Sequence, residues 1–305
     1  MPGERWLIVG CGYVGAQVAR RAREAGHVVY ALTRNQTRFS ELQTLGVEPC
    51  LGHWLEPQSL VGLPAVDRIL VAVPHRADDS GLQTGEQIDG RSAELVEPTH
   101  AIGLQNLLAA IPTGWRKLVY LSTTGVYGQS SEQWVDEQTP LSPVRIGPRI
   151  AVAAERWLSQ VLANRLVPGQ NYCILRLAGI YGPGRIPLAE RLRRGLPLAV
   201  PRKGYLNVVH VSDIARMACV LLESSLQYST YLFSDGQPVL RETFYRHLAE
   251  LCGVAEPEFV EPDQHDAKLR RATDKRISPS RVLAETRFEF EFPDYRSGLA
   301  NALAE

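Results

Sequence analysis

The sequence lacks an excess of either charge and any long apolar run. Its 33 lysines and arginines are balanced by 33 aspartates and glutamates, so no basic field favours binding to nucleic acid or to an anionic membrane surface. No apolar run approaches the roughly 18 residues of a membrane span. No basic and then apolar leader precedes the first apolar segment. These absences predict a cytoplasmic protein that binds neither nucleic acid nor membrane.

The sequence also has few residues with metal or redox spacing. Its five cysteines are scattered, odd in number and form no CxxC pair, which predicts reduced thiols and argues against a disulfide framework. The seven histidines show no HxxxH or HExxH spacing. We therefore expect no metal site.

What is present near the N-terminus is an apolar strand, a glycine-rich turn and a helix, in that order. The apolar run 6–9 precedes the turn, and the Ala/Arg-rich stretch 16–25 follows it. Gly10 permits a tight turn, Gly12 lets the backbone approach a pyrophosphate, and Gly15 allows the helix to pack closely on the strand. The free N–H groups of the helix would face the phosphates. The cofactor-binding residues predicted in this turn are Gly10, Cys11, Gly12, Tyr13, Val14 and Gly15.

The order of elements predicts the fold class. Strands alternate with helices, and several strands are nearly continuous apolar runs, which is typical of a buried parallel sheet. The expected strands are 27–33, 47–51, 67–73, 117–122 and 172–177, and the expected helices are 41–45, 98–111 and 144–165. Polar residues over 76–92 indicate a loop. We expect an α/β protein with a doubly wound parallel sheet of the Rossmann type.

The pattern changes after residue 177, where prolines punctuate short segments. We expect an NAD(P)-binding Rossmann domain over 1–177 and a small C-terminal substrate lobe over 178–305, with a segment of about 205–222 returning to the Rossmann core. The elements expected beyond 177 are strands at 207–211 and 230–234 and helices at 213–223 and 241–252.

The end of the second strand bears on the choice of cofactor. It reads Thr33 and then Arg34, with Arg38 close behind, and no carboxylate occurs before Glu41. An acidic residue here would bind the ribose 2′-OH of NAD, whereas a guanidinium suits the 2′-phosphate of NADP. The sequence favours NADP(H) over NAD(H) and places Thr33, Arg34 and Arg38 in the site. The alternative is that both arginines are solvated surface charges.

Six motifs in order resemble the extended branch of the short-chain dehydrogenase/reductase superfamily, the NAD-dependent epimerase/dehydratase type. The resemblance covers nearly the whole chain. The motifs are the glycine turn 10–15, LSTTGVYG at 121–128, DEQTP at 136–140, RLAGIYGPG at 176–184, HVSD at 210–213 and SDG at 234–236.

The resemblance implies further site residues. Thr123 matches the catalytic Ser or Thr that precedes the VYG triplet. The Tyr of that triplet, here Tyr127, is mostly structural in the family, and a role as replacement acid is the alternative for it. The equally weighted alternative for Thr123 is a hydroxyl that satisfies the end of its strand. Six further positions correspond to the surroundings of the cofactor, namely His53, Val73, Pro74, Ser122, Ala178 and Gly179. The favoured alternative for His53 is a packed loop residue.

One departure from the family pattern stands out. The family uses a Tyr followed four residues later by a Lys, whose charge lowers the Tyr pKa. Alignment on Glu155 places Gly147 and Ala151 at those positions. The sequence has no tyrosine between Tyr127 and Tyr172, and no lysine between 117 and 203. The resemblance therefore indicates an atypical member without the usual dyad.

Two functions stay open at this point. One is an NADP(H)-dependent oxidoreductase, or an enzyme like the nucleotide-sugar epimerases and dehydratases, acting on a small molecule such as a nucleotide sugar. The other is a non-catalytic NADP(H)-binding redox sensor. A homodimer through helices 98–111 and 144–165 is a further expectation, because the second carries an apolar stripe. The same stripe would also suit packing on the sheet. Its residues are Ile150, Ala154, Trp157, Leu158 and Val161.

Overall fold

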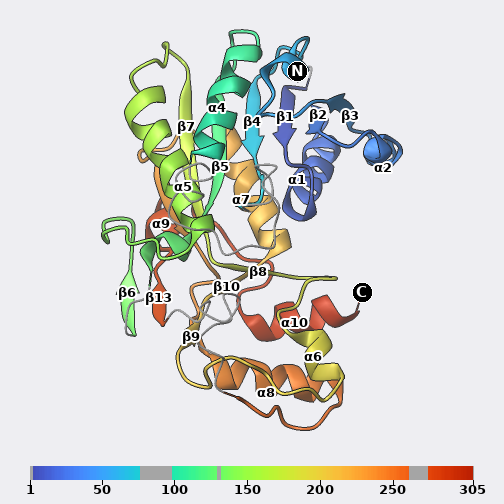
Figure 1. The fold of residues 1–305 in the computed structure, drawn as a ribbon, viewed down its shortest axis with the longest axis vertical. Helices are drawn as coiled ribbons and strands as arrows, with labels where there is room; N and C mark the ends of the chain where they lie inside the picture. The colour runs from blue at the N-terminus through green and yellow to red at the C-terminus, as the bar shows by residue number, and fades with distance from the viewer. Residues whose placement is uncertain (1–2, 76–97, 129–131, 261–273, 305) are drawn as a thin grey trace. The chain divides into compact units, whose positions relative to one another are not determined.

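The computed structural model describes residues 3–75, 98–128, 132–260 and 274–304 (Figure 1). The chain divides into two compact units. Unit 1 comprises Met1–Val126, Pro143–Arg176 and Ala215–Thr230, and unit 2 comprises Tyr127–Ser142, Leu177–Ile214 and Tyr231–Glu305. The expected division into a cofactor domain over 1–177 and a substrate lobe over 178–305 stays a prediction.

A seven-stranded sheet organises unit 1, with the strand order β11-β7-β5-β4-β1-β2-β3. The pairs β1–β2, β2–β3, β1–β4 and β4–β5 are parallel. The strands are β1 (Arg5–Val9), β2 (Val28–Thr33), β3 (Glu48–Leu51), β4 (Arg68–Val71), β5 (Lys117–Thr123), β7 (Asn171–Leu177) and β11 (Thr230–Phe233), the last beginning at the unit boundary. The order reverses at β1, between β4 on one side and β2 on the other. This sheet confirms the predicted doubly wound α/β fold.

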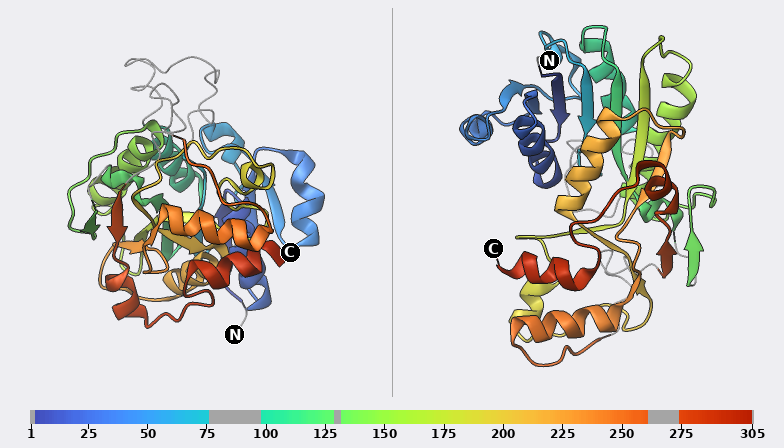
Figure 2. Two further views of the ribbon diagram at one scale, coloured as in Figure 1. Left: turned by 90° about the horizontal axis from the view of Figure 1, so that it is seen from below. Right: turned by 180° about the vertical axis from the view of Figure 1, so that it is seen from behind.

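Helices cover the sheet of unit 1 on both faces (Figures 1 and 2). Because side chains alternate along a strand, Ile8 of β1 faces α1 (Tyr13–Glu24), whereas Leu7 and Val9 belong to the core on the opposite face. That opposite face carries α4 (Thr99–Ala110) and α5 (Ile146–Arg156), which pack on each other. The remaining helical segments of unit 1 are η1 (Gln36–Arg38), α2 (Phe39–Thr44), η2 (Pro57–Leu60), η4 (Thr124–Tyr127, which reaches into unit 2) and most of α7 (Val211–Glu223).

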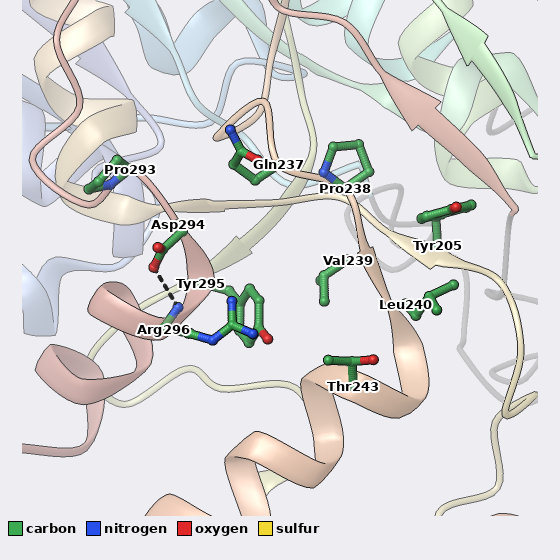
Figure 3. A pocket seen from close by; sticks show the side chains of 10 residues that line it. All are labelled: Tyr205, Gln237, Pro238, Val239, Leu240, Thr243, Pro293, Asp294, Tyr295 and Arg296. Carbon is green, nitrogen blue, oxygen red and sulfur yellow. Dashed lines mark hydrogen bonds between the residues drawn. The ribbon is translucent and has the colours of Figure 1, made fainter.

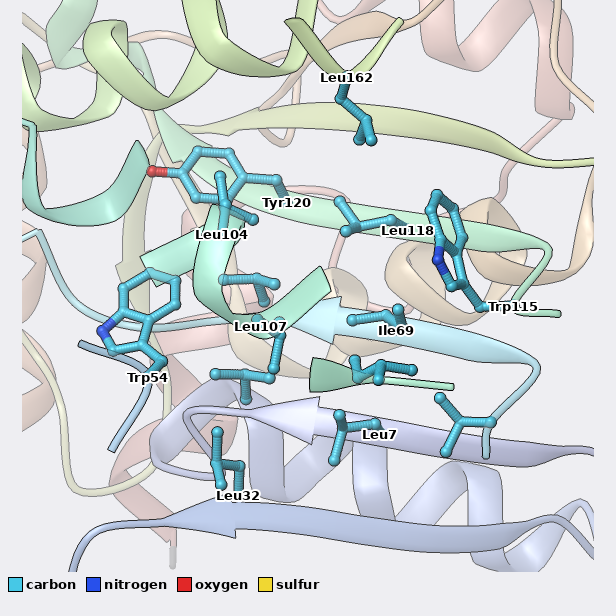
Figure 4. Close-up of a cluster of buried hydrophobic side chains, with 14 of the residues drawn as sticks. Leu7, Leu32, Trp54, Ile69, Leu104, Leu107, Trp115, Leu118, Tyr120 and Leu162 are labelled. Atoms are coloured by element: carbon cyan, nitrogen blue, oxygen red, sulfur yellow. The ribbon is translucent and has the colours of Figure 1, made fainter. Parts of the chain in front are cut away.

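The core under α4 and α5 consists of aliphatic side chains closed by three aromatic ones (Figure 4). Leu104, Leu107 and Leu118 are fully buried there, and burial of one such side chain contributes roughly 1.5–3 kcal/mol. In Figure 4 the hydroxyl of Tyr120 points toward the carboxyl ends of β1 and β4. A polar atom is therefore placed at the edge of the sheet where ligands bind in this fold class.

The helix expected over 144–165 is not continuous. The α-helical part ends at Arg156, and Trp157–Leu162 continue as a π-helical segment, η5. The Ser159 hydroxyl donates to the carbonyl oxygens of Glu155 and Arg156 at 2.9 and 3.2 Å. A hydroxyl bonded to the preceding turn competes with the regular backbone ladder, which accounts for the change at this point.

Unit 2 consists of short elements that pair segments far apart in the sequence. Three two-stranded sheets join β8 (Gly179–Tyr181) to β10 (Val208–His210), β9 (Tyr205–Leu206) to β12 (Val239–Leu240), and β6 (Gln133–Val135) to β13 (Lys275–Ile277). Its helices are α6 (Ala189–Arg193), α8 (Arg241–Cys252), α9 (Ser280–Thr286) and α10 (Tyr295–Ala304), together with the first turn of α7. The strand expected over 207–211 is confirmed as β10, β9 lies just before it, and the helix expected over 241–252 is confirmed as α8.

Two expectations remain, one about a loop and one about membrane-spanning helices. The loop expected at 76–92 lies outside the described residues. Within the described ranges no helix combines the length and apolar character that a membrane span requires.

The apolar stripe of α5 and η5 is used inside the chain. Ile150, Ala154 and Leu158 are fully buried, while Trp157 and Val161 keep part of their surface exposed. Packing within unit 1 therefore explains the stripe, and the homodimer stays a prediction without support from it.

Candidate cofactor-binding site

The glycine turn after β1 is shaped by three glycines with three different constraints. Gly10 has φ +89°, which disfavours other residues, and a Cβ there would lie 2.8 Å from the carbonyl carbon and oxygen of Ala72. Gly15 is equally confined, because a Cβ would lie 2.4 Å from the carbonyl oxygen of Gly10. Both glycines are required by the fold itself.

Gly12 differs, because a Cβ there would meet no atom within 4 Å. Gly12 is exposed and is the N-cap of α1, where no side chain caps the helix and no acidic residue occupies the first turn. The protein's own packing therefore gives no reason for glycine at this position. A ligand phosphate that approaches the helix N-terminus would explain why this position is a glycine.

Arg38 reaches this turn from the end of β2. Its guanidinium donates to the Cys11 carbonyl oxygen at 2.9 Å and to the two carboxylate oxygens of Glu41 at 2.7 and 3.1 Å. The hydrogen bonds between them raise the pKa of Arg38 and lower the pKa of Glu41. The first carboxylate after β2 is thus engaged by an arginine, and is not an open acceptor for a ribose hydroxyl.

The other predicted residues of the β2 end take distinct places. Thr33 is buried, and its hydroxyl accepts from the backbone N–H of Asn35 at 3.2 Å. Asn35 in turn caps η1 by accepting from Thr37. Arg34, between Thr33 and Asn35 in the sequence, is exposed at the surface.

At the carboxyl end of β5 the two predicted hydroxyl residues point to different partners. Ser122 is buried and donates to the Glu155 carboxylate at 2.5 Å, and the same carboxylate is paired with Arg176 at 2.6 Å. Thr123 is half-buried, and its hydroxyl accepts from the backbone N–H of Gly125 at 3.0 Å. Ser122 is therefore bound within unit 1, and Thr123 satisfies the strand end in the way the alternative interpretation expected.

The β4 end holds a group of three side chains that are not among the predicted cofactor-binding residues. Val73 and Pro74 lead to His75, whose Nε2 lies 2.9 Å from the hydroxyl of Tyr120. His100 lies 2.9 Å from the same hydroxyl through its Nδ1. His100 belongs to α4, and Tyr120 lies within the apolar stretch of β5, which is the one sequence signal for this group.

His53 and Trp54 occupy the loop after β3. The Trp54 indole is buried in the core under α4, so it is a packing residue (Figure 4). The backbone N–H of His53 donates to Ser59 at 2.9 Å, and its ring Nδ1 lies 3.5 Å from Glu56. The predicted role of His53 at the cofactor stays open.

Three predicted residues belong to unit 2. Tyr127 and Ala178 are buried there. Gly179 begins β8, and its N–H donates to the Asn207 carbonyl oxygen at 2.9 Å. The predicted role of Tyr127 as a replacement acid stays a prediction, as do the predicted roles of Ala178 and Gly179 at the cofactor.

Unit 2 also contains a cavity of about 430 Å³ between β9, β12, α8 and the start of α10 (Figure 3). Tyr205, Thr243 and Tyr295 line it together with Gln237. Two residues before Gln237, the buried carboxyl of Asp235 has a pKa raised to about 7 by burial and by nearby carboxylates. None of the residues predicted from sequence lines this cavity.

Among the described residues, no three His, Cys, Asp or Glu side chains gather into a group that could hold a metal ion. The donor set of unit 1 thus consists of backbone N–H groups, arginines and hydroxyls. Such a set suits a phosphate-bearing organic ligand.

Comparison with known proteins agrees with this geometry. The model of the NAD dependent epimerase/dehydratase family matches residues 6–232. Protein YeeZ of Escherichia coli is 28% identical over 94% of this chain and 96% of its own length. The structure of a putative NAD-dependent epimerase/dehydratase from Methylobacillus flagellatus is 26% identical, with a TM-score of 0.73 over 99% of this chain and 98% of that one.

A more distant structure shares the fold. The human epimerase family protein SDR39U1, solved with NADPH, has a TM-score of 0.76 at 16% identity and covers 98% of this chain and 99% of its own. The family match spans most of the chain, and the glycine turn has the geometry that such a fold requires. The chain belongs to the NAD dependent epimerase/dehydratase family, within the extended short-chain dehydrogenase/reductase superfamily.

Proposed function

We propose that this protein binds NADP(H) and acts as an oxidoreductase, or as an epimerase- or dehydratase-like enzyme on a nucleotide sugar, without a Tyr-x-x-x-Lys dyad. The observation that carries the proposal is the contrast within the glycine turn. Gly10 and Gly15 are enforced by contacts inside the protein, while Gly12 is exposed and unconstrained. An approaching pyrophosphate explains why glycine stands at position 12.

The turn can be tested by substituting its glycines separately. Gly12→Ala adds a methyl group that meets no protein atom, so we expect an unchanged melting temperature and a loss of NADPH binding. Gly15→Ala places a methyl group 2.4 Å from a carbonyl oxygen, so we expect a lower melting temperature as well. Binding is measured by intrinsic fluorescence during titration with NADPH. Full NADPH binding by the Gly12→Ala variant would contradict the proposal.

The preference for NADP(H) rests on the cationic end of β2. Arg34 is exposed there. The carboxylate of Glu41 is paired with Arg38 and is therefore not an open acceptor for a ribose hydroxyl. The Arg34→Ala variant should bind NADPH more weakly and NADH equally well. Loss of one charged hydrogen bond of roughly 1.5–3 kcal/mol corresponds to at least a tenfold change in Kd. Arg20→Ala, at an exposed position on α1, is the matched control, and equal effects of both variants would refute the assignment.

The second candidate is an NADP(H)-binding sensor without turnover. It is favoured by one observation on α5: a Cβ at Gly147 would lie 2.7 Å from the carbonyl oxygen of His75, so packing leaves no room for a tyrosine at the family's dyad position. Incubation of NADPH and protein with nucleotide sugars and metabolite extracts separates the two candidates. A change in nicotinamide absorbance supports the enzyme, and binding without any change supports the sensor.

A further inference from the structure

Three side chains, two of them buried and one half-buried, form a hydrogen-bonded cluster between β4, α4 and β5. His75 follows β4, His100 lies in the first turn of α4, and Tyr120 belongs to β5. The Tyr120 hydroxyl lies 2.9 Å from Nε2 of His75 and 2.9 Å from Nδ1 of His100. The two imidazoles stack with ring centroids 4.7 Å apart. We call these three residues the His–Tyr cluster.

The hydrogen bonds of the His–Tyr cluster have only one consistent direction. Nε2 of His100 lies 3.3 Å from the Pro74 carbonyl oxygen, which can only accept, so this nitrogen carries the proton. Burial lowers the pKa of His100 well below its usual value, so its ring is neutral and its Nδ1 is a bare acceptor. The Tyr120 hydroxyl must therefore donate to His100.

The direction of this hydrogen bond also fixes the direction of the one between Tyr120 and His75. Since the single Tyr120 proton is given to His100, the Tyr120 oxygen accepts from Nε2–H of His75. Burial also lowers the pKa of His75, to about 4, so its ring is neutral near pH 7 and its Nδ1 is left as a bare acceptor. Tyr120 and His100 thus fix the tautomer of His75.

His75 lies at the switch point of the sheet. β1 and β4 are neighbours in the sheet. A Cβ on Gly10 of the glycine turn would collide with the backbone of Ala72 and with the backbone N of Val73. The glycine turn therefore touches the chain two residues before His75. Ligands of doubly wound sheets bind at the carboxyl ends of the strands where the strand order reverses. His75 also retains part of its surface exposed, whereas Tyr120 and His100 are buried.

Among the described residues, the groups around His75 come from three elements. They are the hydroxyl of Tyr120 on β5, the ring of His100 on α4, and the backbone of Gly147 in the first turn of α5. Glu155, also in the described part of the chain, acts on the cluster electrostatically and raises the pKa of Tyr120 further above the value that burial already sets. These surroundings keep the tyrosine protonated and the histidines neutral.

We infer that His75 is a ligand-binding residue whose Nδ1 accepts a hydrogen bond from a hydroxyl group of the molecule bound at the carboxyl ends of β1 and β4. Tyr120 and His100 are positioning residues that present this acceptor. The ligand chemistry is a sugar hydroxyl, from the ribose of the dinucleotide or from a sugar substrate. The inference rests on the proposed function, because it takes the carboxyl ends of the strands beside the glycine turn as the binding site.

The first test needs no ligand. Nitrogen-15 labelling of the histidines reports which ring nitrogen carries the proton, and His75→Asn and His100→Asn variants assign the signals. We expect both residues as the Nε2–H tautomer from pH 6 to 8. In Tyr120→Phe, His75 should become a mixture of tautomers while the far-ultraviolet circular dichroism is retained. A wild-type His75 protonated on Nδ1 overturns the inference and leaves the proposed function untouched.

The second test adds ligand to the labelled wild-type protein. A change in the Nδ1 signal of His75 on addition of NADP⁺ identifies the ribose as the partner, and a change only after further addition of UDP-glucose identifies the substrate sugar. His75→Phe retains a planar ring and removes the acceptor, so the affected ligand should bind about 2- to 13-fold more weakly, the range expected for one neutral hydrogen bond. If NADP⁺ binds by fluorescence and neither ligand moves the signal, the inference is wrong. If NADP⁺ does not bind at all, the proposed function fails, and the inference fails with it.

Discussion

The buried ion pair between Glu155 and Arg176 should be the most sensitive point in the stability of unit 1. The side chains are 5% and 7% exposed. Arg176 donates to both carboxylate oxygens, with distances between 2.6 and 3.2 Å, and Ser122 donates to one of them at 2.5 Å. The pair links α5 to β5 and β7, beneath the strand end that carries Thr123.

Removal of one partner leaves the other charge without its counter-ion inside the protein. Breaking a buried pair in this way costs about 3–5 kcal/mol, and the Ser122 hydroxyl loses its acceptor too. We therefore expect Glu155→Ala to lower the free energy of unfolding by about 3–5 kcal/mol. At roughly 2–4 °C per kcal/mol for a chain of this size class, the melting temperature should fall by about 6–20 °C.

The assay is denaturant unfolding of unit 1, followed by the fluorescence of its buried tryptophans, with thermal melting as a second probe. Arg5→Ala is the control, because Arg5 forms an exposed pair with Asp67 and exposed pairs contribute less than about 1 kcal/mol. In the double variant Glu155→Leu with Arg176→Met no buried charge is left, so most of the loss should be recovered. The reasoning is refuted if Glu155→Ala behaves like Arg5→Ala, or if the double variant loses the sum of the two single changes.

Two further predictions concern carboxylates of unit 2. The pKa of Asp235 is raised to about 7, so the folded state holds this proton more tightly than the unfolded chain, and the free energy of unfolding should fall as pH rises from about 4 to 7. Asp235→Asn should flatten that slope in urea titrations at several pH values, and an unchanged slope would show that another group is responsible. Asp213 accepts the backbone N–H groups of Glu291 and Phe292 at 2.7 and 2.9 Å, so Asp213→Ala should cost about 2–4 kcal/mol in denaturant unfolding. Asp213→Asn, which retains one acceptor oxygen, should cost less, and a larger loss in Asn than in Ala would contradict this account.

Much of unit 1 was readable from local patterns. The apolar runs of β4, β5 and β7 and the glycine turn each carry their signal within a few residues, because buried parallel strands are continuous apolar segments. The prediction of one regular helix over 144–165 missed the change to a π-helical segment at Trp157–Leu162, since the bonds of Ser159 to the preceding turn are not visible in apolar periodicity. The short strands β6, β8, β12 and β13 were missed, because two or three residues are too few to show a period.

The sequence by itself determined the family, the Rossmann-type sheet and the three glycines. Each of these is indicated by motifs or apolar runs whose residues follow one another closely in the sequence. Only the tertiary structure decided how the side chains are partnered. It paired Ser122 with Glu155, Arg38 with the carbonyl oxygen of Cys11, and His75 with Tyr120. Those partners lie far apart in the sequence or on different elements, and a hydrogen bond depends on distance and direction in space. The direction of the His–Tyr cluster follows from a single carbonyl oxygen, which no sequence pattern reveals.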